Sequence, residues 1–221
     1  RVRSSAASDV YKRQNYYGGA GVGIGDFDND GLEDIFLAAN LIDDKIYRNL
    51  GDFQFEDKTK LSGIINNGSW STGVTVADVN NDGLLDIYVS CELYDDAPFL
   101  RTNKLYINKG DFKFVESAKK WGVNVDRRTR HSVFFDYNND GLLDLYLLNH
   151  PPNTGNFSPF FGSDMTLPEY NLQLFENKGD HFVDVTEKAG LNRAGFPNAA
   201  VIGDFNNCLL YTSDAADDLT R

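Results

Sequence analysis

The sequence has little methionine, few positive charges and no long apolar run. One Met set against 20 Gly, 16 Phe and 11 Tyr argues against a helical protein and favours turns and aromatic strands. With 21 Lys and Arg against 33 Asp and Glu, the net charge of -12 argues against nucleic-acid binding, which needs clustered basic residues. No apolar stretch approaches the roughly 20 residues that span a bilayer. An acidic, β-rich chain with no visible membrane span remains.

Both ends of the chain match a laboratory sequence. Residues 4–14 (SSAASDVYKRQ) and 208–217 (CLLYTSDAAD) are translations of the two strands of a transposon adapter used to prepare sequencing libraries. We therefore interpret 1–14 and 208–221 as adapter scars. Residues 15–207 are then expected to be an internal fragment of a longer protein, from which the signal sequence is missing.

The remaining chain repeats one unit. A nine-residue acidic motif occurs as DFDNDGLED at 26–34 (loop one), DVNNDGLLD at 78–86 (loop two) and DYNNDGLLD at 136–144 (loop three), and DFNN at 204–207 begins a fourth copy. A strand-like run precedes each motif, and an apolar run and an aromatic Asn-x-Gly-Asp hairpin follow each complete one. The unit predicts a four-stranded antiparallel meander. Because such units bury their faces by radial stacking, we expect an all-β partial β-propeller of about three blades plus the start of a fourth.

The repeat also predicts boundaries and two different faces. The expected segments are 1–14 (adapter scar), 15–65, 66–125 and 126–194 (blades with loops one, two and three), 195–207 (truncated fourth blade) and 208–221 (adapter scar). From the last Asp of each loop to the next aromatic strand the distance grows from 13 to 20 to 31 residues, while the rest of the unit is nearly constant. In a meander the acidic loops and the tight turns share one face. The variable loops should therefore lie on the opposite face, where we expect partners to bind.

The acidic motif has the residue types and spacing of a calcium loop. Ca²⁺ takes about 6–8 oxygen ligands; positions 1, 3, 5 and 9 offer side-chain oxygens, position 7 a backbone carbonyl, and Gly at position 6 a sharp turn. The expected ligands, with the leucines acting through their carbonyls, are Asp26, Asp28, Asp30, Leu32, Asp34, Asp78, Asn80, Asp82, Leu84, Asp86, Asp136, Asn138, Asp140, Leu142, Asp144, Asp204 and Asn206. Loop one has four ligand carboxylates and the other complete loops have three, so charge counting predicts the tightest binding at loop one.

Two other calcium-loop families fit poorly. An EF-hand needs a Glu at position 12 and flanking helices, but Leu37, Val89 and Leu147 occupy that position in strand-like runs, and a dockerin-like module also needs a helix there. The strings GVGIGDFDNDGLEDIFLAANLIDDKIYRNLG and QLFENKGDHFVDVTEKAGL instead resemble FG-GAP/VCBS-repeat β-propellers, the type found in integrin α-subunit heads. They look most like bacterial proteins related to cartilage acidic protein, which carry an ASPIC/UnbV domain. The resemblance implies seven blades, bound Ca²⁺ and an extracytoplasmic location (secreted, periplasmic or outer-surface).

Residues suited to catalysis form no recognisable arrangement. His131, His150 and His181 lie at different offsets in three repeats, so no Ser/His/Asp or Cys/His grouping follows from their spacing. His150 begins the longest variable loop and stays a functional candidate, whereas the other two are expected to be structural. Cys208 lies in a scar, and Cys91 is expected to be a small buried hydrophobe. We name no catalytic residue and lean against an enzyme.

Aromatic residues gather in the variable loops. They are Tyr94, Phe99, Phe157, Phe160, Phe161 and Tyr170, and Trp70 lies on an inter-blade connection that reaches the same face. Two interpretations stay open: these side chains fold back onto their own blades, or they form an aromatic and acidic surface that grips a protein or polysaccharide. We therefore expect a calcium-binding, extracytoplasmic binding, adhesion or scaffold module. The alternative is the non-catalytic part of a secreted carbohydrate-active enzyme, either a lyase or a hydrolase.

Overall fold

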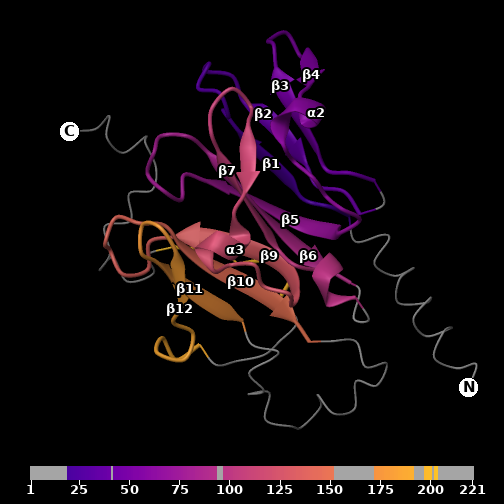
Figure 1. Cartoon of the computed structure of the whole chain (residues 1–221). Helices are drawn as coiled ribbons and strands as arrows, with labels where there is room; N and C mark the ends of the chain where they lie inside the picture. Colours follow the sequence, from indigo (N-terminus) through magenta and orange to yellow (C-terminus); the bar gives the residue numbers. More distant parts are fainter. Residues whose placement is uncertain are drawn as a thin grey trace, which may run out of the picture.

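The described part of the chain forms three four-stranded antiparallel sheets, one after another in sequence (Figure 1). The computed structural model describes residues 19–40, 42–93, 97–151, 172–191, 197–200 and 202–203. The first sheet contains β1 (Val22–Gly25), β2 (Asp34–Leu37), β3 (Lys45–Asn49) and β4 (Phe55–Asp57). The second contains β5 (Trp70–Ala77), β6 (Asp86–Glu92), β7 (Lys104–Asn108) and β8 (Phe114–Glu116). The third contains β9 (Arg128–Phe135), β10 (Asp144–His150), β11 (Gln173–Asn177) and β12 (Phe182–Asp184).

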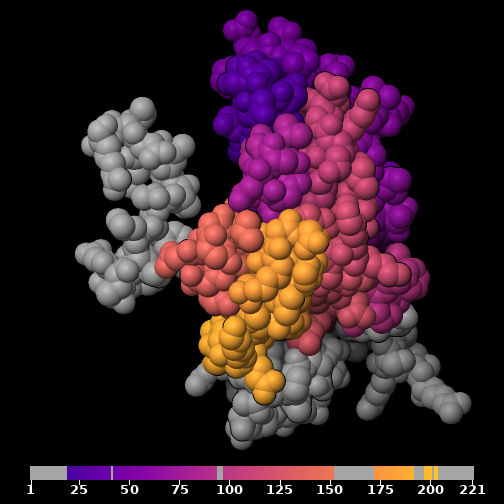
Figure 2. Space-filling view, turned by 60° about the vertical axis from the view of Figure 1, so that its left-hand side comes forward, coloured from indigo at the N-terminus to yellow at the C-terminus, as the bar shows by residue number. Residues whose placement is uncertain are grey.

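Each sheet is a meander, because its strands pair in the order in which they follow one another along the chain. The β-branched and aromatic runs of the sequence form these strands, and the Gly, Asn and Asp clusters form the turns between them. The predicted all-β fold with blade-like sheets is confirmed. Figure 2 shows successive segments following one another down the surface, from indigo at the top to orange at the bottom.

Short helices are the elements that the sequence did not predict. They are α2 (Thr59–Ser62), the 3-10 helix η1 (Pro98–Leu100) and α3 (Ala118–Trp121). Helices α2 and α3 follow the outermost strands of the first two sheets. Each ends at a left-handed glycine, Gly63 with φ 80° or Gly122 with φ 76°. None of the helices in the described residues is long and apolar enough to cross a bilayer.

The innermost strands β1, β5 and β9 lie next to one another, with small residues where they meet. A Cβ atom on Gly21 would lie 2.6 Å from the backbone nitrogen of Val74, and one on Gly23 would lie 2.7 Å from a Val74 methyl group. At the next interface, a Cβ on Gly73 would lie 3.0 Å from the carbonyl oxygen of Arg130. Larger side chains at these positions would push the sheets apart, so glycine allows the sheets to approach closely.

Two apolar clusters fill the spaces between consecutive sheets. The first includes Phe36 and Ile46 of the first sheet with Val89 of the second, all fully buried. The second joins sheets two and three, and in it the rings of Trp121 and Phe182 lie 5.7 Å apart. Cys91 lies in the first cluster with no exposed surface, and burial raises the pKa of its thiol to about 11. The prediction that Cys91 is a buried hydrophobe is therefore confirmed.

Candidate metal centre

The three acidic loops join the first and second strands of successive sheets, so they lie at the same end of the molecule. They are also linked directly to one another. The Asn29 side chain in loop one donates to the Gly83 carbonyl of loop two at 3.0 Å, and Asn81 in loop two donates to the Gly141 carbonyl of loop three at 3.3 Å. The strand ends from which the connections of varying length start lie at the opposite end, as expected for a meander.

The first carboxylate of each loop shapes the turn. In loop one, Asp26 accepts hydrogen bonds from the backbone N–H groups of Asp30 at 3.0 Å and Gly31 at 2.7 Å. Asp78 and Asp136 accept the same pair of bonds in loops two and three. The turn needs a left-handed residue at position six, where Gly31 has φ 87°, and glycine adopts this conformation without strain.

The ninth residue of each loop has a buried carboxylate. These residues are at most 1% exposed, and they are Asp34, Asp86 and Asp144. Asp34 accepts the backbone N–H of Phe27 at 2.9 Å and that of Asn49 at 2.8 Å, and its two counterparts accept the equivalent pairs. These bonds tie each acidic loop to the outer hairpin of its own sheet, which is a fixed scaffold for the loop.

Burial disfavours the charge on these ninth-position groups. It raises the pKa of Asp86 to about 7 and the pKa of Asp144 to about 6, and it also raises the pKa of Asp34. Nearby carboxylates of the same loops act in the same direction. A bound cation favours the ionised form and would offset both effects.

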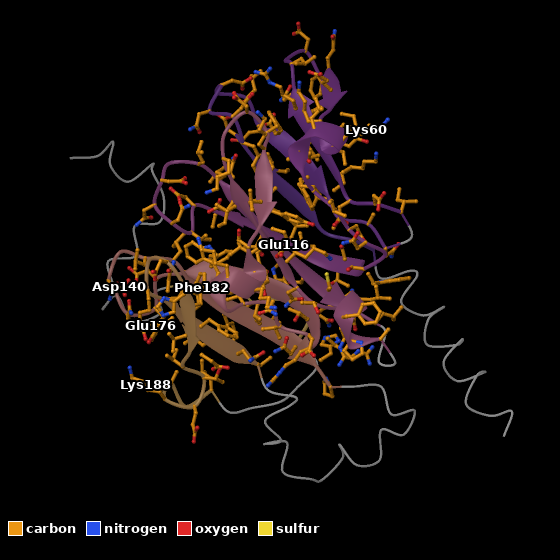
Figure 3. The ribbon with its side chains drawn as sticks, viewed as in Figure 1. Lys60, Glu116, Asp140, Glu176, Phe182 and Lys188 are labelled. Atoms are coloured by element: carbon orange, nitrogen blue, oxygen red, sulfur yellow. The ribbon has the colours of Figure 1, made fainter. Side chains whose placement is uncertain are left out.

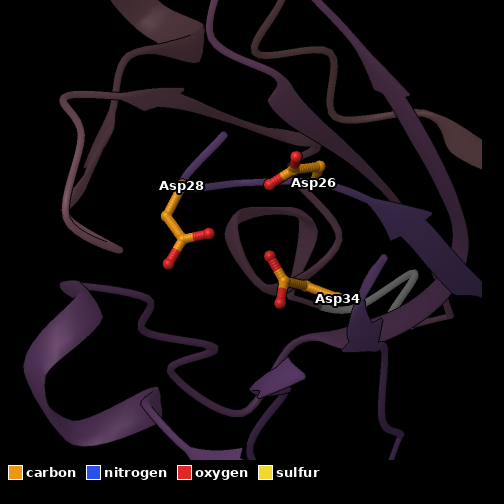
Figure 4. Close-up of side chains that lie close together, drawn as sticks. All are labelled: Asp26, Asp28 and Asp34. Atoms are coloured by element: carbon orange, nitrogen blue, oxygen red, sulfur yellow. The ribbon is translucent and has the colours of Figure 1, made fainter. Parts of the chain in front are cut away.

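Loop one gathers three carboxylates around a common point (Figure 4). Each of Asp26, Asp28 and Asp34 offers one oxygen, and these oxygens all lie within 4.8 Å of one another. Oδ1 of Asp28 is buried and accepts no hydrogen bond, although buried polar atoms normally have a partner. Burial is the main cause that raises the pKa of Asp28, and Asp30 and Asp26 raise it further. Ca²⁺ binds hard oxygen ligands such as these carboxylates. The buried Oδ1 of Asp28, which accepts no hydrogen bond, is free to be such a ligand, so the residues of loop one fit this cation.

Loops two and three have asparagine at the third position. Asn80 and Asn138 each accept the backbone N–H of the fifth residue at 3.0 Å and donate to its carboxylate at 2.9 Å. At the seventh position, Leu32, Leu84 and Leu142 each donate their backbone N–H to the fifth carboxylate. In loop one, Asp26, Asp28 and Asp34 are close enough together to share one ion, and the remaining expected ligands of the three complete loops stay predictions. Asp204 and Asn206 lie outside the described residues.

The asparagines of the second and third Asn-x-Gly-Asp hairpins have a role that sequence reasoning missed. The Asn108 amide donates to the Phe27 carbonyl in loop one at 2.8 Å and to the Leu85 carbonyl at 3.1 Å. Asn177 likewise donates to the carbonyl of Val79 in loop two at 2.8 Å. The sequence indicated only a turn residue, and the recurrence of Asn in every unit was the available sign. These side chains join loop one to the second sheet and loop two to the third.

A charged neighbour of the loops was also missed. In loop one, Nε of Arg48 lies 2.7 Å from Oδ2 of Asp28, and Nη2 of Arg48 lies 2.9 Å from Oδ2 of Asp30. Arg48 belongs to β3, far enough along the chain that no loop pattern includes it. The equivalent residue is Ile107 in β7 and Glu176 in β11.

Of the aromatic residues expected in the variable loops or beside them, the structure describes Phe99 and Trp70. Phe99, on η1, is 75% exposed. Trp70 is only 3% exposed, because it begins β5 and packs inside the fold, so of the two open interpretations packing against the blades holds for this residue. His150 ends β10, with Nε2 2.8 Å from the Pro197 carbonyl oxygen. The other aromatic candidates, Tyr94, Phe157, Phe160, Phe161 and Tyr170, lie outside the described residues.

The fold and the loops together define a repeat protein of blade-like sheets. Residues 26–89, which contain the first two acidic loops, match the FG-GAP-like repeat family. The chain is also 28% identical over 149 residues to cartilage acidic protein 1 of Xenopus tropicalis, an alignment that covers 67% of this chain and 22% of that protein. The chain therefore carries an FG-GAP-like repeat and is a distant relative of cartilage acidic protein 1, as the resemblance in the sequence predicted. It spans about a fifth of the length of that relative.

Proposed function

We propose that this chain is a calcium-binding FG-GAP-like module that acts outside the cytoplasm as a binding, adhesion or scaffold surface. The observation that carries the proposal is the carboxylate cluster of loop one, in which the buried Oδ1 of Asp28 accepts no hydrogen bond beside Asp26 and Asp34. The repetition of the loop in three sheets supports the same function, because each copy places three or four of the expected ligand carboxylates within nine residues, and a cation would offset the repulsion between them.

Bound calcium would offset the repulsion between the carboxylates of each loop and so stabilise the folded chain. Like charges within a few ångströms repel each other, and a divalent cation between them removes that repulsion. Extracellular calcium modules bind with dissociation constants near 10⁻⁴–10⁻³ M. At about millimolar calcium, a site of about 10⁻⁴ M adds about 1.4 kcal/mol of stability by mass action. This gain is available where calcium stays near millimolar, which supports an extracytoplasmic location.

The partner surface in this proposal is the end opposite the acidic loops. Phe99 is exposed there on a short helix, and exposed aromatic side chains favour contact with a protein or a polysaccharide. Phe99→Ala should weaken binding of such a partner without lowering the thermal midpoint. A lowered midpoint with unchanged binding would show instead that Phe99 has a packing role.

Isothermal titration calorimetry on calcium-stripped protein tests the metal function. We expect calcium uptake by the unaltered chain and no uptake by the triple variant Asp26→Ala, Asp78→Ala, Asp136→Ala, which loses the first ligand of every loop. Asp28→Asn is the matched control, because asparagine already stands at this position in loops two and three; it should weaken uptake without abolishing it. Equal uptake by the triple variant, or none by the folded unaltered chain, would contradict the proposal.

A further inference from the structure

One strand position places a different charge beside each acidic loop. It is the residue just before the hairpin asparagine: Arg48 in β3, Ile107 in β7 and Glu176 in β11. The three residues occupy the same register, since each pairs with the middle residue of the outermost strand, Glu56, Val115 or Val183. The nine loop positions are nearly the same in the three copies, so this neighbour is a major difference in the surroundings of the loops.

Arg48 of β3 places a positive charge against loop one. Its guanidinium contacts Asp28 at 2.7 Å and Asp30 at 2.9 Å, and both of these are expected metal ligands. The contact lowers the negative charge that the loop offers to a metal ion. The two carboxylates must also break or weaken their ion pairs with Arg48 before they can bind calcium.

Glu176 has the opposite effect on loop three. Its Oε1 accepts a hydrogen bond from Nδ2 of Asn138 at 3.2 Å, and the same amide donates to Oδ2 of Asp140 at 2.9 Å. The Glu176 carboxylate therefore borders the third and fifth ligand positions, and Figure 3 shows Glu176 and Asp140 next to each other. Lys178 lies 2.7 Å from the same Oε1 and offsets part of the negative charge that Glu176 brings to loop three.

Loop two has no charge at this position. Ile107 is 2% exposed and packs in the apolar cluster between the second and third sheets. Its loop has three ligand carboxylates, Asp78, Asp82 and Asp86, with neither an added nor a neutralised one from this strand. Loop two therefore serves as the reference within the same chain.

We propose that this strand position sets the calcium affinity of each loop. Glu176 supplies a fourth carboxylate to loop three, and Arg48 competes with calcium in loop one. Calcium should therefore fill loop three first, loop two next and loop one last. The inference rests on the proposed calcium binding, and it reverses the order that counting carboxylates within the loops predicts.

A calcium titration followed by ¹H–¹⁵N NMR on the full chain observes the loops one by one. The backbone N–H groups of Gly31, Gly83 and Gly141 donate to the first carboxylate of their own loops at 2.7, 2.8 and 2.9 Å, so each amide resonance reports on one site. We expect the Gly141 resonance to move at the lowest calcium concentration and the Gly31 resonance at the highest, with midpoints separated by about tenfold or more.

Two variants place isoleucine, the residue found beside loop two, at the equivalent positions beside loops one and three. Arg48→Ile should lower the calcium midpoint of Gly31 by about tenfold, and Glu176→Ile should raise that of Gly141 by a similar factor. Glu176→Gln, which keeps size and polarity, gives the same test if the isoleucine variant does not fold. Gly83 should stay unchanged in all three variants and is the internal control.

The outcomes separate this inference from the function on which it rests. If no glycine resonance responds to calcium in the folded chain, the calcium-binding function itself fails. If all three respond but loop one fills first, or if Arg48→Ile leaves the Gly31 midpoint unchanged, the affinity-setting role is overturned while calcium binding stands.

Discussion

Loops one and three have the same frame and different electrostatic neighbours. In both, the ninth carboxylate (Asp34 or Asp144) is fully buried and accepts one backbone bond from the loop and one from the outer hairpin. In loop one the adjoining strand contributes Arg48 to two ligand carboxylates, whereas in loop three it places Glu176 against the third position. The frame holds the loop in shape, and the neighbour changes the charge that a metal ion would meet.

This contrast separates what the nine-residue motif determines from what it leaves open. The motif determines the turn, because its first and ninth carboxylates and its glycine act within the loop and on its immediate hairpin. Metal affinity also depends on charges a few ångströms away, which come from residues that are distant in sequence. Repeats with nearly the same motif can therefore differ in affinity within one protein.

The largest effect is expected from removing the ninth carboxylate. Asp34→Ala and Asp144→Ala each leave two backbone N–H groups without an acceptor, at a cost of about 1–3 kcal/mol per group, or about 2–6 kcal/mol in total. The two variants should lose similar stability in urea unfolding carried out in chelator, since the frame is the same. If either variant lost stability only in calcium, the hydrogen bonds from the two backbone N–H groups to the ninth carboxylate would have no structural role.

A smaller loss is expected where the hairpin asparagine joins two blades. Asn108→Ala removes donors to Phe27 of the preceding loop and to Leu85, which should cost about 1–3 kcal/mol in urea unfolding. Asn49→Ala is the matched control, because the Asn49 amide donates to the Glu33 carbonyl in the acidic loop of its own sheet. Equal losses in the two variants would show that the link between blades adds nothing.

The bond between neighbouring loops should contribute less again. Asn29→Gly keeps the left-handed backbone at φ 56° and removes the bond to the Gly83 carbonyl, so we expect a loss of about 0.5–1 kcal/mol. Asn139→Gly is the control, because Asn139 has φ 58° but no such loop partner among the described residues. A larger loss for Asn139→Gly would show that backbone freedom, not the bond, dominates.

The smallest effect is expected from Arg48→Ile, and its sign should depend on calcium. In chelator the variant loses the ion pairs to Asp28 and Asp30, so its thermal midpoint should fall by about 1–2 °C. In saturating calcium the loss should vanish or reverse, because the metal then neutralises these carboxylates. Thermal melts followed by circular dichroism in both buffers measure the difference. A drop that is equal in the two buffers would mean that Arg48 and calcium do not compete.

Much of the fold and of the candidate site could be predicted because the governing interactions are local. The strand runs, the Asn-x-Gly-Asp turns and the acidic loops are read from adjacent residues, and the variation in connection length assigned the two faces. The short helices α2 and α3 were not predicted, since four-residue helices depend on their packing and on a left-handed glycine at the end.

The residues that were missed depend on contacts between segments that are distant in sequence. Arg48 lies 18 residues beyond Asp30, and Glu176 lies 38 residues beyond Asn138. Trp70 was placed on an inter-blade connection, whereas it is the first residue of β5 and is buried. Only the packing of strands against loops reveals such contacts.

A thermal melt in about 1 mM calcium and in excess chelator tests the central claim most directly. A single site of about 10⁻⁴ M should add about 1.4 kcal/mol, which raises the midpoint by about 3–6 °C for a chain of this size, and further sites should add to the shift. The triple variant Asp26→Ala, Asp78→Ala, Asp136→Ala should show no shift. A folded β spectrum that melts at the same temperature in both buffers would contradict calcium binding by the acidic loops.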